Sequence, residues 1–599
     1  MTFGTFAQFL EKLDVISSRL EITAILADLY QQFSREERQF GSYLLKGSLV
    51  PEYESLEFQL STKMIVRALA KMRKIGGDSI AAGETQTNLF GDDDGSTDQK
   101  WVEQQFRNIG DLGLVAEQIV GSANTDESIT TVETVFLTLS AIARESGQGS
   151  QEQKLQQLVD LLSILDGKSA KYVVRIILNK LRLGFSTMTI LDALSWAVHG
   201  TKIDHEVLEN AYQKKADIGR LAQVYLEAKT AEQRQLALDH YTVTAGVPVV
   251  PQLCQRLPSP EEVIKKLKEV YVEPKYDGLR AQIHVFPNPD NPTGKPQVRV
   301  FTRSLEDVTE MFPEAVVVAQ QIRAKSAVLD GEAIGYDPKT GELVSFQRTI
   351  TRKRKHDIEA TSEETPIKFF VYDLLSVDEK SMIDVPLRER KAILRTLFDD
   401  SKQLVQPEFI ITSDPVELQL FHERQLELGL EGVVIKQVDS PYQSGRKGWY
   451  WVKLKELAGT QGKLSDTLDC VVLGYYPGQG KRTDFGVGAF LVGVRDGEEI
   501  KTIAKIGTGL TDDQFRELKQ RCDALAVDRQ PTEYVVPKGL IPSVWTSPGL
   551  VVEIAADEIT RSPMHTAGVA LRFPRLVKFR DDKTVEQITT KAELEGIAG

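Results

Sequence analysis

Lys275 is the residue whose neighbours most strongly suggest covalent chemistry in this chain. It lies in the string EPKYDGLR (273–280), directly before an Asp-Gly turn signal. A lysine amine is a nucleophile once it has lost its proton, although a lysine before Asp-Gly can equally be an ordinary surface residue. The chemical interpretation gains weight because compatible charged and aromatic residues follow in order along the chain. These are Arg303, Glu332, Tyr372, Asp373, Glu431, Lys436, Lys453 and Lys455.

This ordered set resembles the motifs of the covalent nucleotidyltransferases, and specifically those of the ATP-dependent DNA ligases of the archaeal and eukaryotic replicative type. The resemblance covers nearly the whole chain. LRLGFSTMTILDAL (181–194) is similar to the helical DNA-binding domain of that group. LDCVVLGYYPGQGKR (468–482) and GVALRFPRLVKFRDDK (568–583) are similar to its C-terminal OB-fold domain.

The resemblance implies an enzyme that seals nicks between a 5′-phosphate and a 3′-hydroxyl in duplex DNA, during replication, repair and recombination. Lys275 would take AMP from ATP, AMP would move to the 5′-phosphate, and the 3′-hydroxyl would then release it. The amine attacks only when unprotonated, whereas a free lysine is protonated at neutral pH. The family's mechanism therefore implies that nearby cations favour the unprotonated amine. The cations expected there are Arg280, Lys436, Lys453 and Lys455.

The resemblance also assigns the contacts to ATP. Glu273 would accept a hydrogen bond from the adenine amino group, and Tyr372, where the family commonly has Phe, would stack on the nucleotide. Arg280 and Arg303 would hold the ribose or a phosphate. The other nucleotide contacts that it implies are Glu332, Lys436, Arg446, Lys453 and Lys455.

Glu332 and Glu431 are the expected ligands of magnesium, a hard ion that prefers carboxylates and water; use of two ions would fit the same pair. Each acid could instead belong to a surface salt bridge.

In the C-terminal region, Arg572, Arg575 and Lys578 lie in RFPRLVK. By resemblance they face the ATP tail and orient the departing pyrophosphate, which requires the C-terminal domain to close over the nucleotide. Lys481 and Arg482 would either contact the duplex or form a solvated hairpin tip.

The distribution of apolar residues divides the chain into three domains that would position these side chains. Residues 1–243 show the three- and four-residue spacing of helices, which predicts an all-α domain; by the resemblance this is the DNA-binding domain. Residues 244–457 carry short β-rich runs with occasional helices, which predicts an α+β domain; by the resemblance this is the nucleotidyltransferase domain. Residues 458–599 carry regularly spaced short strands with Gly-rich turns, typical of a β-barrel with the OB-fold.

One helical hairpin stands out in the first domain. A helix is predicted over 171–183, and a second begins at Ser186 or Thr187 and ends at Gly200. The cations near the turn could hold a phosphate, or the segment could be a plain helical hairpin. These cations are Lys171, Arg175, Lys180 and Arg182.

Residues 81–100 are polar, Gly-rich and acidic, which predicts a flexible loop. Within this loop Gln86, Leu89 and Phe90 resemble the short QxxLF peptide with which bacterial proteins dock on the sliding clamp. The apolar pair could equally pack onto its own domain.

Composition limits the remaining options. The chain has 73 basic and 86 acidic residues, a net charge of −13, so any DNA-binding surface must be a local concentration of cations. No apolar run approaches the ~20 residues of a membrane span. Three cysteines cannot form a four-thiolate zinc site. A reducing cytoplasm is the simplest interpretation of so few cysteines, and the resemblance to DNA ligases implies a nucleoid-associated monomer.

Three rival functions share part of this pattern. An NAD-dependent ligase typically carries a four-cysteine zinc module, and an RNA ligase or capping enzyme lacks the long helical domain. A catalytically inactive DNA-binding protein would not need Lys275 with its cationic partners.

Overall fold

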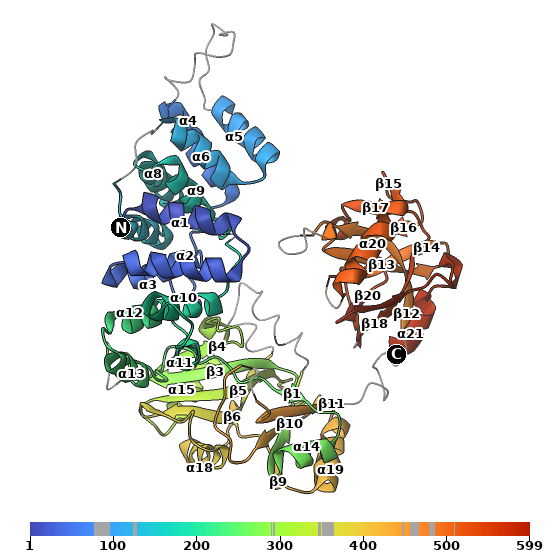
Figure 1. The fold of residues 1–599 in the computed structure, drawn as a ribbon. Helices are drawn as coiled ribbons and strands as arrows, with labels where there is room; N and C mark the ends of the chain where they lie inside the picture. The colour runs from blue at the N-terminus through green and yellow to red at the C-terminus, as the bar shows by residue number, and fades with distance from the viewer. Residues whose placement is uncertain are drawn as a thin grey trace. The chain divides into compact units, whose positions relative to one another are not determined.

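Apolar residues at helical spacing fold the N-terminal part of the chain into packed helices, as the sequence predicts (Figure 1). The structure is a computed structural model. It describes residues 1–76, 96–123, 129–181, 183–288, 290–291, 294–344, 349, 365–445, 448–455, 467–478, 485–507, 510–556 and 558–598. Two units can be distinguished, Met1–Leu454 and Lys455–Gly599. No helix among these residues is long and apolar enough to cross a bilayer.

The helices of the first unit begin at residue 3. Those before the first strand are α1 (Phe3–Val15), α2 (Arg19–Gln32), α3 (Arg35–Leu45), α4 (Thr62–Gly76), α5 (Ser96–Ile109), α6 (Leu112–Ala123), α7 (Val132–Arg144), α8 (Ser150–Ser163), α9 (Gly167–Ile177), α10 (Thr187–His199), α11 (His205–Lys214), α12 (Ile218–Glu227) and α13 (Ala231–Asp239). Ser34 and Glu37 form a capping box at the start of α3, which satisfies backbone groups that would otherwise lack partners.

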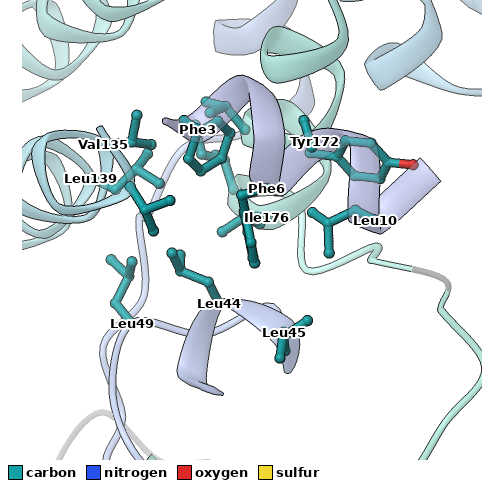
Figure 2. Packing of buried hydrophobic residues seen from close by; sticks show 14 of the residues in the cluster. Phe3, Phe6, Leu10, Leu44, Leu45, Leu49, Val135, Leu139, Tyr172 and Ile176 are labelled. Atoms are coloured by element: carbon teal, nitrogen blue, oxygen red, sulfur yellow. The ribbon is translucent and has the colours of Figure 1, made fainter. Parts of the chain in front are cut away.

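The core of this helical region lies where α1 crosses its neighbours. Figure 2 shows Phe3, Phe6 and Leu10 of α1 packed among apolar side chains of α3, α7 and α9. Phe3 and Phe6 are fully buried, and their ring centroids lie 5.5 Å apart. Burial of such side chains contributes about 1.5–3 kcal/mol each to folding.

Three helix boundaries differ from the predictions, and one of them is the start of α9 at Gly167, ahead of the predicted Lys171. The first helix of the hairpin is α9, which ends at Ile177, and Asn179 then takes a positive φ of 51°. The second is α10, which Gly200 ends in the left-handed conformation, as predicted. The loop expected to reach residue 100 gives way to α5 at Ser96, where Asp98 pairs with Arg73 of α4 at 3.0 Å.

Lys171 and Arg175 are buried and bind carboxylates rather than facing solvent, which favours the plain-hairpin interpretation. Arg175 donates to Asp111 at 2.8 Å and to Asp14 at 2.9 Å, and Lys171 donates to Glu11 at 3.0 Å. Burial acts to raise the pKa of Asp111, but the Arg175 guanidinium holds it below its usual value. These ion pairs join α9 to α1 and to the start of α6.

The remainder of the first unit contains two sheets. One has the order β1-β11-β10-β2-β9 and the other the order β4-β3-β5-β6-β7, with β8 pairing β6. The strands are β1 (Gln255–Arg256), β2 (Val270–Pro274), β3 (Leu279–Phe286), β4 (Gln297–Phe301), β5 (Ala327–Gly335), β6 (Ile367–Val377), β7 (Lys380–Ser381), β8 (Leu404–Val405), β9 (Ile410–Thr412), β10 (Gly432–Gln437) and β11 (Trp451–Lys455). The main strands fall on the β-rich runs of the sequence.

Helices cover one face of each sheet. Helices α14 (Pro260–Leu267) and α19 (Pro415–Glu427) share a core with β2, β10 and β11. Helices α15 (Glu314–Gln321) and α18 (Leu387–Leu397) share another with β3, β5 and β6. A third apolar cluster, which includes Val328 of β5, Leu375 of β6 and Trp451 of β11, joins the two sheets.

The second unit is rich in strands, as predicted, with one additional helix, α20 (Asp512–Ala524), and the terminal α21 (Lys591–Ala598). Its strands are β12 (Leu468–Tyr476), β13 (Ala489–Asp496), β14 (Glu499–Ile506), β15 (Ala526–Val527), β16 (Tyr534–Val535), β17 (Val544–Thr546), β18 (Val551–Ala555), β19 (Glu558–Arg561), β20 (Val569–Arg572) and β21 (Arg575–Phe579). The β-rich runs of the sequence in this region correspond to β12, β13, β14, β18 and β21. The strands of two to four residues are too short to show a period in the sequence.

The Arg175 ion pairs predict a local stability effect. Arg175→Met should lower the opening free energy of α6 and α9 by about 3 kcal/mol, because removing one partner of a buried pair leaves its carboxylates uncompensated. Native-state hydrogen exchange on peptides from these helices measures it. Lys180→Met, at an exposed position just after α9, is the control. Equal protection in both variants would contradict the prediction.

Candidate active site

Lys275 and Glu431 face each other at the open end of one strand pair. Strand β2 runs antiparallel to β10, with Pro274 opposite Val433. The pairing continues beyond the strands, because Lys275 N donates to the Gly432 carbonyl at 2.8 Å and Glu431 N donates to the Lys275 carbonyl at 3.1 Å. The Lys275 amine lies 2.6 Å from Glu431 Oε2, and both side chains are about one-fifth exposed. The sheet therefore places the predicted nucleophile and one predicted metal ligand in contact.

The immediate partner of the Lys275 amine is thus an anion, whereas the family resemblance implies a cluster of cations around it. The expected cations are close by, but carboxylates engage two of them. Lys436 pairs with Glu273 and Arg280 pairs with Asp330. The physical reason is general: a charge taken out of water is stable only when it is paired and hydrogen-bonded.

Arg280 is held on several sides. Its guanidinium binds both oxygens of the fully buried Asp330, at 3.0 and 2.5 Å, and donates to the Gln252 carbonyl at 2.6 Å. The Tyr442 hydroxyl donates to Asp330 at 2.9 Å and accepts from Arg280 at 3.2 Å. A bidentate pair of this kind fixes direction as well as charge.

Glu273 is 2% exposed and lies between two lysines. Its Oε2 is 2.6 Å from the amine of Lys436, and its Oε1 accepts from Lys391 of α18. Lys436 also donates to the Tyr372 carbonyl at 3.2 Å. The residue expected to recognise adenine therefore has a cationic partner at each oxygen.

Glu332 lies opposite Arg280 in the ladder between β3 and β5. Desolvation, helped by the nearby Asp330 and Glu431 carboxylates, raises the pKa of Glu332 to about 7 against the pull of Lys275 and Arg280. Gly278 packs here so tightly that a Cβ would lie 2.8 Å from Glu332 Cγ. Only glycine leaves room for the turn between Lys275 and β3 at this point.

Aromatic rings from three segments surround the cations. Lys436 lies 4.5 Å from the ring centroid of Tyr372 and 4.2 Å from that of Trp451, within cation–π range. Trp451 also packs edge-on to Tyr442 at 5.6 Å. Tyr372 thus contacts Lys436 and lies in the site, at the position expected to stack on the nucleotide.

Several cations act on the Cys254 thiol. Burial raises its pKa, and positive charges near it act to lower the same pKa. They belong to Arg280, Lys436, Lys453 and Lys275.

The structure gives fewer contacts for the other residues that are predicted to bind the nucleotide. Arg303 is exposed in the turn after β4, and no hydrogen bond or ion pair joins its side chain to the described part of the site. Lys453 and Lys455 lie on β11, where Lys453 is opposite Arg256 of β1. Arg446 lies outside the described residues.

In the second unit, Arg572 and Arg575 are exposed at the end of β20 and the start of β21, and Lys578 pairs with Glu553 at 3.4 Å. Lys481 and Arg482 fall outside the described residues, as do Gln86, Leu89 and Phe90 of the predicted clamp motif.

Sequence reasoning missed three residues of this site, Asp330, Tyr442 and Lys391. Asp330 had a usable signal, since it lies two residues before Glu332 in a strand and so shares its face. Lys391 follows three charged residues in the helical string LRERK. That pattern is typical of a solvated helix face.

The described residues contain no group of three or more His, Cys, Asp or Glu side chains placed to hold a metal. The donors present nevertheless suit magnesium, which is commonly held by one or two carboxylates together with substrate phosphates. The Glu431 and Asp330 charges act to raise the pKa of Glu332, and a divalent cation would relieve that repulsion.

Comparisons with known proteins agree along the whole chain. Family models match residues 2–195 ("DNA ligase N terminus"), 251–455 ("ATP dependent DNA ligase domain") and 483–583 ("ATP dependent DNA ligase C terminal region"). A "Probable DNA ligase" of Dictyoglomus turgidum is 39% identical, with 99% of this chain and 97% of that protein covered. "DNA ligase 2" of Thermofilum pendens is 34% identical, with 99% and 96% covered.

Among solved structures, the chain named Pmar-Lig_Pre aligns with 96% of this chain and 99% of its own, with a TM-score of 0.51 and 16% identity. That likeness concerns the fold. The sequence relationships go further: this chain belongs to the ATP-dependent DNA ligases, which seal nicked DNA through an adenylate intermediate.

Proposed function

We propose that Lys275 is the residue of this DNA ligase that carries AMP. The observation that supports the assignment most directly is the position of its amine. It lies at the open end of the β2–β10 pair, 2.6 Å from Glu431, and the ion-paired Lys436 of β10 and Arg280 of β3 supply further cations to the site. A lysine on an ordinary surface lacks such a set of positive charges to neutralise phosphate oxygens.

The first step forms a bond between the Lys275 nitrogen and the α-phosphorus of ATP and breaks the bond from that phosphorus to the pyrophosphate oxygen. An ammonium has no lone pair, so its proton must leave first. Glu431 Oε2 is within hydrogen-bond distance of the amine and is placed to receive that proton. AMP then passes to the 5′-phosphate of the nick, and the 3′-hydroxyl displaces it. Positioning and charge neutralisation dominate catalysis of such displacements.

The surrounding residues would each bind a different part of the nucleotide. Arg280, aimed by Asp330 and Tyr442, would bind the ribose or a phosphate, and Arg303 would do so from its exposed turn. Glu273 would accept from the adenine amino group while Tyr372 packs on the base. The further contacts proposed for the nucleotide are Glu332, Lys436, Arg446, Lys453 and Lys455.

Glu332 and Glu431 would hold magnesium together with phosphate oxygens. When bound, the ion would neutralise the negative charge that develops on the phosphate. Within the chain itself, Lys275 and Arg280 already act to lower the pKa of Glu332, so they favour the ionised carboxylate that such binding needs.

The second unit would complete the site for the first step. Arg572, Arg575 and Lys578 would bind the tail of ATP and orient pyrophosphate for departure. Arg572 and Arg575 are exposed at the end of β20 and the start of β21.

The proposed partner is nicked duplex DNA, bound through backbone phosphates in a salt-sensitive manner without sequence preference. We further propose a monomer in the cytoplasm, associated with the nucleoid.

The three residues of the predicted clamp motif would dock on a sliding clamp and so raise the concentration of the ligase at new nicks. These residues are Gln86, Leu89 and Phe90.

Replacing Lys275 tests the nucleophile. With magnesium and ATP labelled at the α-phosphate, the wild-type chain should retain label after denaturation, and Lys275→Ala should show only background, because no other amine replaces the nucleophile. Lys265→Ala, at an exposed lysine of α14, should label like the wild type. Equal labelling of Lys275→Ala would refute the assignment.

Removing the charge of Asp330 tests the role of Arg280. Asp330→Asn should slow formation of lysyl-AMP by about 10- to 100-fold, since hydrogen bonds between charged groups contribute about 1.5–3 kcal/mol. Tyr442→Phe should slow it less, because only one hydroxyl is lost. Single-turnover labelling measures both rates, and Asp399→Asn, at a carboxylate 81% exposed, is the control. An unchanged rate in Asp330→Asn would contradict the role.

The exposed arginines of the second unit should matter for one step only. Arg575→Ala should slow lysyl-AMP formation by about tenfold or more, since it removes charge stabilisation of the leaving group. Sealing of a nick that already carries AMP should remain near the wild-type rate. Arg516→Ala, at a site 63% exposed on α20, controls for general loss of charge. Equal slowing of both steps by Arg575→Ala would argue against this role.

A further inference from the structure

Lys391 is a buried cation to which the proposed reaction assigns no role. It lies on α18, a helix that covers the six-stranded sheet, and its side chain is 8% exposed. Its amine donates to Glu273 Oε1, on β2 of the other sheet. Burying an amine is unfavourable unless it gains a strong partner, so the contact with Glu273 accounts for its position.

The preceding residue fixes α18 in place. Arg390 is fully buried and binds both oxygens of Asp373 on β6, at 2.8 and 3.0 Å. It also donates to the carbonyls of Val385 at 2.5 Å and Ser440 at 3.1 Å. The direction in which α18 presents Lys391 is therefore determined by a bidentate ion pair one residue away.

The two lysines act on different oxygens of one carboxylate. Lys436 comes from β10 and binds Glu273 Oε2 at 2.6 Å, whereas Lys391 comes from α18 and binds Oε1. The last torsion of a glutamate side chain has a broad energy minimum, so a single donor leaves the carboxylate plane free to rotate. Together, the Lys391 hydrogen bond at Oε1 and the Lys436 ion pair at Oε2 act on opposite oxygens and so fix the plane and the direction of the remaining lone pairs.

We infer that Lys391 is a positioning residue that, by holding Glu273, sets the preference of the nucleotide pocket for a purine with a 6-amino group. The inference rests on the proposed function, in which Glu273 accepts from that group. A carboxylate held in one orientation accepts a hydrogen bond from the 6-amino group. A purine with hydrogen at carbon 6 has no donor there and forms no such bond. A carboxylate free to turn toward Lys436 discriminates less between the two.

The charges around Lys391 make this preference sensitive to pH. Glu273 and Tyr271 face it from β2, Asp373 from β6 and Lys436 from β10. Burial lowers the pKa of Lys391 to about 8, with Glu273 opposing and Lys436 adding to the effect. The ammonium is therefore present below this pKa and is lost as the pH rises through it, and the hold on Glu273 weakens in the same range.

The test compares self-adenylation of the full chain with ATP and with purine riboside triphosphate, which has hydrogen in place of the 6-amino group. The quantity measured is the ratio of kcat/KM for the two nucleotides. In Lys391→Met this ratio should fall about tenfold at pH 7, because a hydrogen bond to a charged group no longer orients Glu273. A purely structural defect would slow both nucleotides alike and leave the ratio unchanged.

The pH profile and a conservative variant separate the explanations further. The wild-type ratio should fall between pH 7 and pH 9 toward that of Lys391→Met, whose own ratio should stay flat. Lys391→Arg should keep a high ratio at pH 9, because a guanidinium remains charged there. Arg388→Met removes a half-exposed cation from the same helix and should match the wild type throughout.

The outcomes are distinguishable. A wild-type chain that labels well but shows no preference for ATP would refute the role of Glu273 within the proposed function. A wild-type preference that survives intact in Lys391→Met, or that does not change with pH, would overturn the inference about Lys391. If Lys391→Met is labelled by neither nucleotide, the kcat/KM ratio of Lys391→Arg at pH 9 decides between the explanations. A high ratio supports the inference, and a ratio as low as that of the wild type at pH 9 overturns it.

Discussion

Pairing of buried charges is the constraint on which this active site depends. Nucleotide chemistry requires several cations at the junction of two sheets, yet isolated charges removed from water destabilise a fold. The chain meets both demands by giving Lys275, Arg280 and Lys436 a carboxylate each. Those carboxylates are Glu431, Asp330 and Glu273. Two of these pairs join neighbouring strands, and the Lys275–Glu431 pair joins the segments just beyond β2 and β10, so the pairing also supports the relative position of these elements.

The pairing also indicates how the site is expected to work. A nucleotide brings phosphate oxygens that compete with the carboxylates for the same cations. A carboxylate that gives up a cation can then act on another group, as Glu431 would on a proton or a metal. Tyr442 and Trp451 are buried and Tyr372 packs against their cluster, and electrostatic interactions are stronger in surroundings of low dielectric constant.

Much of the fold followed from the sequence because its signals are periodic. Helical spacing in the first domain and apolar runs in the second gave elements of the correct type, and the order of Lys275, Glu332 and Lys436 predicted residues that lie on neighbouring strands or strand ends. Local sequence patterns did not predict which side chains pair with these residues. Asp330 and Lys391 acquire their roles through contacts between strands and helices far apart in the chain. Asn179 ended α9 early, because its positive φ broke a pattern that looked helical to residue 183.

The central claim is that the amine paired with Glu431 is the one that carries AMP. It is tested most directly by incubating the chain with ATP and magnesium, digesting it under conditions that preserve the phosphoramidate, and locating the adenylate by mass spectrometry. We expect the modification on the peptide that contains residues 273–280, at Lys275. Adenylate found instead on Lys391, Lys436 or Lys453, with Lys275 unmodified, would contradict the account.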